Sequence, residues 1–427
     1  MGDGAGALGA ARGDRTRLPH AGEPLMEFPH GLRALNHGEF RRFYLSQFAA
    51  QVGSWMQNVA QAWLVLQLTN SPFKLGLLAT LQFSPVLLFS IVSGAIADRL
   101  PKRPLLVATQ TTLACQGLLL ALLVATGHVE YWHVAVLGLA LGFANVVDQP
   151  ARQSFVMELV GRADVSSAVA LNSAGFNLAR IVGPAIAGVV IGRFGVGPTF
   201  FVNGLGFVGV IVTLLRMETQ GRPTSAARAS IFEEIAEGVR YAAGTPRLRL
   251  AIGLVLVVSL CVFNFSVYVP LLAKNVLGLG AEGFGFLMAS LGVGAVGGAL
   301  TVGARAVRHP SVRSMFASAT LALSMLLALG VTRRIELAVP LLFFTGYWGI
   351  MLMASCNTSI QLQAPDALRG RVMSIYTWVS GGVFPIGAFI VGTISQWWGV
   401  SAAFLWNGTL GLAAVGALTL WWRFRRD

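Results

Sequence analysis

Charged residues are scarce in this sequence. Only 11% of its 427 residues are charged and 55% are hydrophobic, whereas soluble domains carry roughly 25% charged residues. A soluble fold of this size could not cover so much apolar surface with so few charges, so the composition predicts a protein embedded in the lipid bilayer. The net charge of +13 fits basic loops on one side of a membrane. Because the charges do not cluster with stacking aromatics, we expect no nucleic-acid partner.

Cysteine and histidine are also rare. The three cysteines, Cys115, Cys261 and Cys356, all lie inside apolar stretches, an odd set that provides neither a disulfide framework nor metal-ligand spacing. The six histidines fall within the first 40 residues or at the edges of apolar segments, and they form no histidine–cysteine cluster of the kind that binds metal. We therefore expect no metal and no cofactor.

The sequence lacks the motifs of ATP binding and of catalysis within a membrane. A phosphate-binding loop requires Gly-Lys-Ser/Thr, and none of the three lysines, Lys74, Lys102 and Lys274, lies in one. There is no His-Glu-x-x-His, no intramembrane histidine pair and no acyl-transfer dyad. These absences argue against ATP-driven transport and leave a membrane-embedded enzyme as a remote alternative.

Long apolar runs, separated by Gly, Pro and charged residues, predict an all-α membrane protein. Each run is near the ~20 residues that a bilayer crossing needs. The twelve predicted spans are 43–68, 73–97, 104–126, 132–158, 167–191, 198–216, 250–273, 283–304, 312–331, 336–361, 370–394 and 399–421.

The distribution of basic residues predicts the orientation in the membrane. With the N-terminus inside, 24 of the 31 lysines and arginines lie on the inner side and 5 on the outer side, while Arg152 and Arg180 lie within spans. Inner loops of membrane proteins carry an excess of Lys and Arg. We therefore expect a multi-pass protein of the cytoplasmic (inner) membrane with both termini cytoplasmic.

A polar stretch between the sixth and seventh spans divides the chain into two halves. Within it, Ile231, Ile235 and Val239 recur every four residues, which predicts an amphipathic helix on the cytoplasmic surface. The predicted organisation is a cytoplasmic N-terminal tail (1–40), a six-helix bundle (41–216), a cytoplasmic linker with the amphipathic helix (217–249), a second six-helix bundle (250–422) and a short cytoplasmic tail (423–427).

The two halves resemble each other after a shift of 204 residues. Gly183, Gly188 and Asn203-Gly204 in the first half correspond to Gly387, Gly392 and Asn407-Gly408 in the second. Glycines and an asparagine that keep register over more than twenty residues indicate a duplicated six-helix unit. Such halves can rock about a central site to give alternating access.

A short basic loop follows the second span. It contains Gly94, Asp98, Arg99, Lys102 and Arg103. An acid at the entrance of a basic hairpin can accept hydrogen bonds from neighbouring donors and serve as a conformational latch. The alternative is a loop that only sets the topology through its positive charge.

This loop resembles the loop 2–3 signature of the major facilitator superfamily, although Pro101 stands where that family usually has Gly. The resemblance implies twelve helices in two pseudo-symmetric bundles around a central cavity. It also implies that Asp98 docks near the inner end of the eleventh helix, around residues 369–372.

Two further stretches are Leu68-Thr69-Asn70-Ser71-Pro72 and the run from Asn177 to Gly188. Both resemble the efflux branch of that superfamily that contains the enterobactin exporter. Gly183-Pro184-Ala-Ile-Ala-Gly188 is similar to the helix-5 signature of antiporters, with Ala187 in place of one glycine. The resemblance implies proton-driven antiport. The same residues also have a structural explanation that does not require antiport. Gly183 and Gly188 permit close helix packing, and Pro184 bends the helix.

Three ionisable residues lie deep within the predicted spans: Asp148, Arg152 and Arg180. Charges in a bilayer core are costly, so each is a candidate for function. Asp148 can bind the coupling proton, and Arg180 can bind an anionic group of the substrate. Alternatively the three form a structural charge cluster, and a permanent arginine partner would make Asp148 a poor proton carrier.

Polar residues form stripes on several predicted spans. A polar stripe on a membrane helix faces partner helices or water rather than lipid, so these residues either line a cavity or join helices. The candidates for the cavity lining are Gln47, Gln51, Ser54, Asn58 and Gln61 on the first span, Ser173 and Asn177 on the fifth, Asn264 on the seventh, and Trp348 and Asn357 on the tenth.

Together these patterns predict a secondary active transporter that exports small amphipathic molecules, such as a siderophore, a drug or a metabolite, in exchange for protons. Its expected partners are the small-molecule substrate, protons and the bilayer, and we expect a monomer. The alternative with the same fold is a proton symporter for nutrient uptake.

Overall fold

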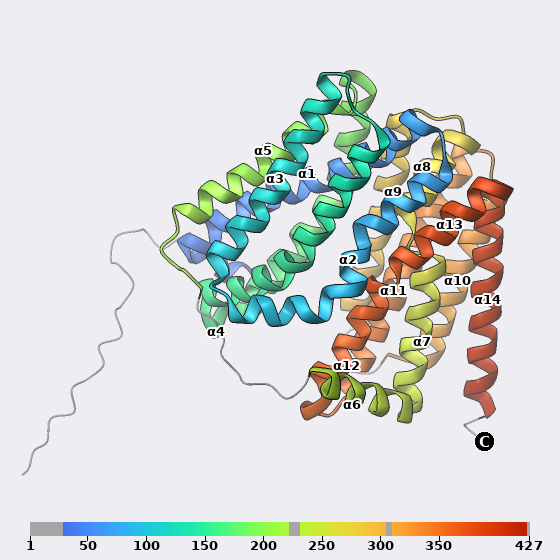
Figure 1. The fold of residues 1–427 in the computed structure, drawn as a ribbon. Helices are drawn as coiled ribbons and strands as arrows, with labels where there is room; N and C mark the ends of the chain where they lie inside the picture. Colours follow the sequence, from blue (N-terminus) through green and yellow to red (C-terminus); the bar gives the residue numbers. More distant parts are fainter. Residues whose placement is uncertain (1–28, 222–230, 305–309, 425–427) are drawn as a thin grey trace, which may run out of the picture.

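The computed structural model describes residues 29–221, 231–304 and 310–424, which form helices without any strand (Figure 1). This confirms the prediction of an all-α protein. The N-terminal group of helices consists of the short 3₁₀ helix η1 (His30–Asn36), α1 (Gly38–Thr69), α2 (Pro72–Arg99), α3 (Lys102–Ala125), α4 (Tyr131–Phe194) and α5 (Gly197–Leu215).

The C-terminal group follows the linker. It consists of α6 (Ile231–Gly244), α7 (Pro246–Cys261), α8 (Phe265–Leu271), the π-helical turn η2 (Leu272–Val276), α9 (Ala281–Ala304), α10 (Val312–Val331), α11 (Ile335–Gln363), α12 (Asp366–Thr377), the π-helical turn η3 (Trp378–Gly382), α13 (Phe384–Trp398) and α14 (Val400–Phe424).

The 64-residue helix α4 is two helices joined at Gly161. This residue has φ 67° and ψ 174°, a backbone conformation that side-chain-bearing residues rarely adopt. The break separates a first arm (131–160) from a second arm (162–194). The two arms cover the predicted spans 132–158 and 167–191.

Ten helical segments in the described part of the chain are long and apolar enough to cross a membrane, with α4 counted once. Helix α1 is not among them, because its row of Gln, Ser and Asn side chains lowers its hydropathy. The structure thus supports a multi-spanning protein, and the number of twelve spans stays a prediction.

Two of the predicted spans are interrupted helices. The chain leaves α7 after Cys261 and resumes as α8 at Phe265, with Asn264 in a non-helical conformation between them. Likewise, α12 passes through η3 into α13. Irregular backbone at membrane depth requires protein or water around it, so both interruptions are expected to face the interior.

The two groups touch through two pairs of glycines. A Cβ atom added to Gly76 of α2 would lie 2.8 Å from the Cα of Gly392 of α13, and one added to Gly285 of α9 would lie 2.7 Å from the Cα of Gly188 of α4. Gly76 and Gly285 lie near the starts of α2 and α9, and Gly188 and Gly392 lie near the ends of α4 and α13. On α13 the contact therefore lies at the end away from α12. The backbones approach this closely only because no side chain intervenes.

Positions related by the 204-residue shift have matching neighbours. Gly183 packs against Trp55 of α1, and Gly387 packs against Asn264 just after α7. Gly204 packs on Leu118 of α3, as Gly408 does on Leu327 of α10. The repeat in the sequence therefore corresponds to a repeat in helix packing.

The glycine contacts give a testable expectation about closure. Substituting Gly392 by Leu should force α2 and α13 apart, since no space exists for its side chain. A cysteine placed at the cavity-lining Ala79, in a chain without Cys115, should then react several-fold faster with an impermeant maleimide applied from the face opposite to the termini. Gly209→Leu is the matched control, because a Cβ there meets nothing within 4 Å. Equal labelling in both variants would contradict closure by this contact.

Candidate functional site

A cavity of about 210 Å³, the central cavity, lies between the two groups of helices. Its lining comes from α1, α2, the second arm of α4, α9, α11 and α13, and from residues around the α7–α8 break. Most of the lining is apolar, and six aromatic side chains contribute to it: Trp55, Phe83, Phe263, Phe265, Phe284 and Phe384. Its polar lining residues are Asn58, Gln61, Gln82, Arg180 and Ser266.

Three of these polar side chains, those of Gln61, Arg180 and Ser266, have buried hydrogen-bonding atoms without partners. Gln61 is 1% exposed, and neither its Oε1 nor its Nε2 is hydrogen-bonded. The Nη2 of Arg180 donates to Oδ1 of Asn177 at 2.9 Å, while its Nε is buried and has no partner. Buried polar groups are normally hydrogen-bonded, so these atoms are available to a molecule that occupies the cavity.

A second cavity of about 160 Å³ adjoins the first and lies wholly within the N-terminal group. It shares Asn58, Gln82 and Phe83 with the central cavity. Its lining is more polar but uncharged, with Ser54, Gln57, Asn58, Gln82, Asn145 and Asn203 among the residues that surround it. The two cavities therefore form an apolar chamber beside a polar one.

Gln57 connects three helices at the wall of the second cavity. Its Nε2 donates to Oε1 of Gln116 on α3 at 2.8 Å, and its Oε1 accepts from Nδ2 of Asn203 on α5 at 2.7 Å. Ser54 donates to the backbone oxygen of Ala50 at 2.9 Å. Gln57, which is not part of the predicted stripe, thus joins three helices. Of the stripe itself, Ser54 also donates to Oδ1 of Asn203 on α5 at 3.4 Å.

Asp148 is nearly completely buried, with 2% exposure, between α3 and the first arm of α4. Its Oδ1 accepts hydrogen bonds from Oγ1 of Thr109 at 2.9 Å and Nε2 of Gln110 at 2.7 Å, and its Oδ2 lies 3.4 Å from Nε of Arg152. Three donors therefore surround one carboxyl group. These contacts hold Asp148 between two helices.

The structure separates two parts of the predicted charge cluster. Asp148 and Arg152 pair on one face of the first arm of α4, toward α3, whereas Arg180 lies on the second arm and lines the central cavity. The positions of Asp148 and Arg180 along the chain do not predict this separation, because the backbone break at Gly161 changes the helical phase between the two arms.

Several other predicted lining residues lie away from both cavities as the described residues outline them. Gln47 is buried with an unpartnered Oε1, and Asn264 donates its Nδ2 to the oxygen of Leu260 at 2.7 Å. The remaining ones are partly or fully exposed, and this set comprises Gln51, Ser173, Asn177, Trp348 and Asn357. Of the ten predicted residues, Ser54, Asn58 and Gln61 contribute directly to a cavity wall.

The sequence reasoning missed the contribution of α2. Leu75, Leu78, Ala79, Gln82 and Phe83 all line the central cavity. Gln82 could have been predicted as a cavity-lining residue, because it is an isolated amide in an otherwise apolar span that also contains a proline. The aromatic residues carry no such signal, because a phenylalanine in a membrane helix faces lipid as readily as a cavity.

The residues of the helix-5 motif lie where the two groups of helices meet. Gly183 packs on α1, and Gly188 packs on α9. A Cβ added to Gly285 of α9 would lie 2.6 Å from the backbone oxygen of Pro184. The motif therefore allows α4 to contact both its own group and the opposite one.

The predicted latch loop contacts the start of the linker. Lys102 is 0% exposed and forms an ion pair with Glu158 of α4 at 2.7 Å. Arg103 donates through its backbone N–H to the oxygen of Gln220 at 3.0 Å and through Nη2 to that of Leu215 at 2.7 Å. Arg99 is exposed, no side chain within 4 Å confines Gly94, and the side chain of Asp98 lies outside the described residues.

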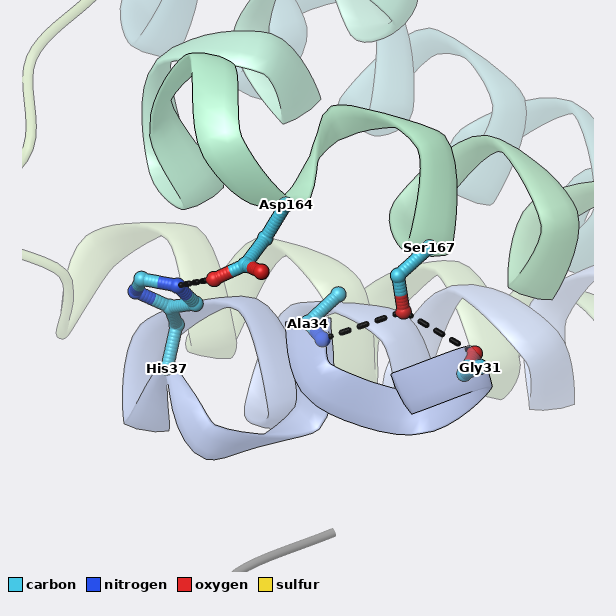
Figure 2. A network of polar contacts seen from close by, with 5 residues as sticks. All are labelled: Gly31, Ala34, His37, Asp164 and Ser167. Carbon is cyan, nitrogen blue, oxygen red and sulfur yellow. Dashed lines mark hydrogen bonds and ion pairs between the residues drawn. The ribbon is translucent and has the colours of Figure 1, made fainter. Parts of the chain in front are cut away.

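The N-terminal segment is held against the break in α4 (Figure 2). Nε2 of His37 lies 2.9 Å from Oδ2 of Asp164. Oγ of Ser167 accepts from the backbone N–H of Ala34 at 3.1 Å and donates to the oxygen of Gly31 at 2.9 Å. These contacts fix η1 on the second arm of α4 immediately before α1 begins.

Helix α6 is anchored on the C-terminal group. Glu237 forms an ion pair with Arg371 of α12, and Gly238 lies against the same arginine. Arg369 pairs with Asp366 at 2.7 Å. Near the start of the linker, Glu39 accepts from the backbone N–H of Glu218 at 2.6 Å. The linker is thus attached to both groups of helices.

No group of His, Cys, Asp or Glu that could hold a metal ion occurs among the residues for which the structure gives positions. What the geometry provides is a cavity between two groups of membrane-spanning helices. This arrangement defines the class of multi-pass helical transporters for small molecules.

The chain belongs to the transmembrane secretion effector family of the major facilitator superfamily, which matches residues 30–426. This match confirms the superfamily and the efflux branch predicted from the loop and helix-5 motifs.

Characterised relatives cover most of the chain. It is 22% identical to the staphyloferrin A transporter of Staphylococcus aureus, over 85% of this chain and 91% of that protein. It is 28% identical to the multidrug efflux pump Tap of Mycolicibacterium fortuitum, over 83% and 89% respectively. It is 27% identical to the enterobactin exporter EntS of Escherichia coli, over 90% and 91%.

Solved structures share the fold at low sequence identity. The nucleoside transporter NupG superposes with a TM-score of 0.73 at 11% identity, covering 90% of this chain and 98% of that one. A bacterial homologue of the human lysosomal transporter Spinster, in an inward-facing and unoccupied conformation, gives 0.68 at 12% identity, covering 92% and 96%. These similarities establish the arrangement of helices.

The buried side chain of Lys102 and its ion pair should stabilise the fold. Lys102 is 0% exposed, whereas the side chain of Glu158 is 30% exposed, so truncating Lys102 removes both the packing of its aliphatic stem and the ion pair. We expect Lys102→Ala to lower the thermal unfolding midpoint of the purified protein clearly more than Arg193→Ala, which truncates an exposed arginine at the end of α4.

A double variant separates charge from packing in this experiment. Lys102→Met with Glu158→Leu removes both charges, so it should recover part of the stability lost in Lys102→Ala. If Lys102→Ala and Arg193→Ala unfold at the same temperature, the ion pair does not stabilise the fold.

Proposed function

We propose that this protein is a secondary active transporter that exports small amphipathic molecules in exchange for protons by alternating access. The observation that carries the proposal is the central cavity between the two groups of helices, which is mainly apolar but contains a few convergent polar groups. Binding sites for small organic molecules have this composition.

The proposed topology has twelve crossings in two six-helix bundles, 41–216 and 250–422, with the tails 1–40 and 423–427 and the linker 217–249 in the cytoplasm. Counting α1 and both arms of α4 adds two crossings to the ten apolar helical segments. The excess of basic residues on the side of the termini supports a cytoplasmic location for both ends in the inner membrane.

This topology assigns a state to the structure. With both termini in the cytoplasm, the starts of α2 and α9 and the ends of α4 and α13 lie on the outer side. The Gly76–Gly392 and Gly188–Gly285 contacts would then close the protein toward the outside. A rocking motion that separates these pairs would open the cavity on that side. The conformation is the one in which an exporter takes up its substrate from the cytoplasm.

Asp148 is the proposed site of the coupling proton. An acidic side chain this deep in a membrane-spanning segment is costly unless it has a function. Its carboxyl group is held by donors from α3 and α4. Leu113 and Asn145 in the wall of the second cavity lie about one helical turn from Gln110 and Asp148. Movement of α3 against α4 would alter the contacts of this carboxyl group.

The direction of transport is supported by the efflux relatives. The staphyloferrin A transporter, the pump Tap and the exporter EntS all align over more than four fifths of the chain. The direction of substrate movement relative to proton flow in liposomes distinguishes export from proton-coupled uptake, in which substrate and proton move in the same direction.

The test uses the purified protein in liposomes with an imposed pH gradient and a fluorescent amphipathic substrate. Wild type should move the substrate against the direction of proton flow. Asp148→Asn should abolish gradient-driven accumulation while retaining exchange of labelled for unlabelled substrate, because exchange needs alternating access but no proton transfer. Thr109→Val is the matched control variant, because it removes one hydrogen-bond donor to Asp148 and leaves the carboxyl group of Asp148 in place.

Two outcomes would contradict parts of the proposal. Undiminished gradient-driven transport in Asp148→Asn would reduce Asp148 to a structural role between α3 and α4. Substrate that moves together with the protons in wild type would replace export by symport.

A further inference from the structure

The central cavity contains a single charged residue among the described residues that line it. Arg180 is that residue, and no Asp or Glu lies in the same lining. Asp148, the nearest buried acid along the chain, is engaged by Thr109, Gln110 and Arg152. A guanidinium group at membrane depth without a carboxylate partner is costly, so its position calls for a compensating interaction.

The hydrogen bonding of Arg180 is incomplete. Its one hydrogen bond goes to the neutral Asn177, and its Nε is buried without an acceptor. A guanidinium group carries five N–H donors in a planar fork that matches a carboxylate or a similar oxyanion. The unused part of this fork is therefore an anion-binding group.

Gln61 provides a second unpartnered group in the same cavity. Both its carboxamide atoms lack hydrogen bonds although the residue is buried. Its Nε2 can donate to an anion and its Oε1 can accept from a neighbouring N–H or O–H of the same ligand. Gln61 comes from α1 and Arg180 from α4, so the ligand would bridge two helices.

The rest of the cavity is suited to a flat apolar body. The rings of Phe83 and Phe384 lie 4.5 Å apart across the boundary between the two groups of helices, and Trp55, Phe263, Phe265 and Phe284 line other parts of the wall. Such rings bind apolar and aromatic groups by contact area and stacking.

We infer that the central cavity binds amphipathic anions, with a carboxylate or similar oxyanion on Arg180, a hydrogen-bonding group on Gln61 and an aromatic or apolar body against the phenylalanines. The inference rests on the proposed function, because it names the substrate class of the proposed transport cavity. Organic cations of the same size are disfavoured, since the cavity offers them a positive charge and no acid.

A matched pair of probes tests the charge preference. N-dansylglycine carries a carboxylate, and its primary amide has nearly the same shape without the charge. Binding to the full-length protein in detergent is followed by dansyl fluorescence without any gradient. We expect wild type to bind the acid about tenfold more tightly than the amide, as a charge-assisted hydrogen bond to a buried arginine implies.

The variants assign this preference to the residues. Arg180→Gln should abolish the preference for the acid, so that the acid binds no more tightly than the amide. Elution of this variant as wild type from size-exclusion chromatography shows that it is folded. Arg180→Lys should retain part of the preference, because it keeps the charge but not the planar fork. Gln61→Leu should weaken binding of the acid several-fold. Arg193→Gln, on the same helix but exposed, should behave as wild type.

Three results would overturn the inference: equal binding of acid and amide to wild type, a preference that survives Arg180→Gln, or no saturable binding of the acid. The outcome is independent of proton coupling. If liposomes show no gradient-driven transport but the acid preference depends on Arg180, the inference holds and the proposed coupling fails.

Discussion

A polar group within a bilayer must find its hydrogen-bond partners inside the protein, because no water replaces them. This constraint organises the N-terminal group of helices. Gln57 joins α1 to α3 and α5 through its two carboxamide atoms, and Asp148 joins α3 to α4 through Thr109 and Gln110. Polar residues scattered along apolar helices thus specify which helices are neighbours, whereas apolar packing alone would allow many arrangements.

The same constraint separates structural polar groups from functional ones. Where the partners are complete, as at Gln57, the side chain stabilises the fold. At Gln61 and Nε of Arg180 buried atoms remain unpartnered, and there the deficit lies at the surface of the central cavity. A bound molecule can correct it, which is why these residues, rather than the more numerous satisfied ones, indicate what the cavity binds.

Much of the fold could be predicted from the sequence because the signals were strong and local. Apolar runs of suitable length gave the helices, and glycines in register gave equivalent positions such as Gly188 and Gly392, which the structure places in matching contacts between the groups. The break at Gly161 was visible only as a short interval between two spans, and the interruption at Asn264 had no signal, because the surrounding residues are as apolar as a continuous helix requires.

The site was harder to predict, because a cavity depends on which way each helix faces. Five polar residues give the first span a helical phase, and the structure places Asn58 and Gln61 of this stripe in the lining of the central cavity. For Asp148 and Arg180 the sequence gives the depth of each residue along its span. It does not give the rotation of one arm of α4 relative to the other, because the break at Gly161 lies between them. The walls from α2, which are aliphatic and aromatic apart from Gln82, resemble a lipid-facing surface in sequence.

The separation of Asp148 from Arg180 has a consequence for coupling. If the proton and an anionic substrate both bound at one arginine–carboxylate pair, each would displace the other by direct competition. Here Arg152 pairs with Asp148, and Arg180 lines the central cavity. Substrate and proton would then influence each other through helix positions.

The second cavity is bounded by α3 and the first arm of α4, which hold the contacts of Asp148, and it shares Asn58, Gln82 and Phe83 with the central cavity. A shift of α4 that alters the donors around Asp148 would also move Arg180, because both arms belong to one continuous stretch of chain joined at Gly161. Alternating access, rather than shared ligation, would then make proton binding and substrate release mutually dependent.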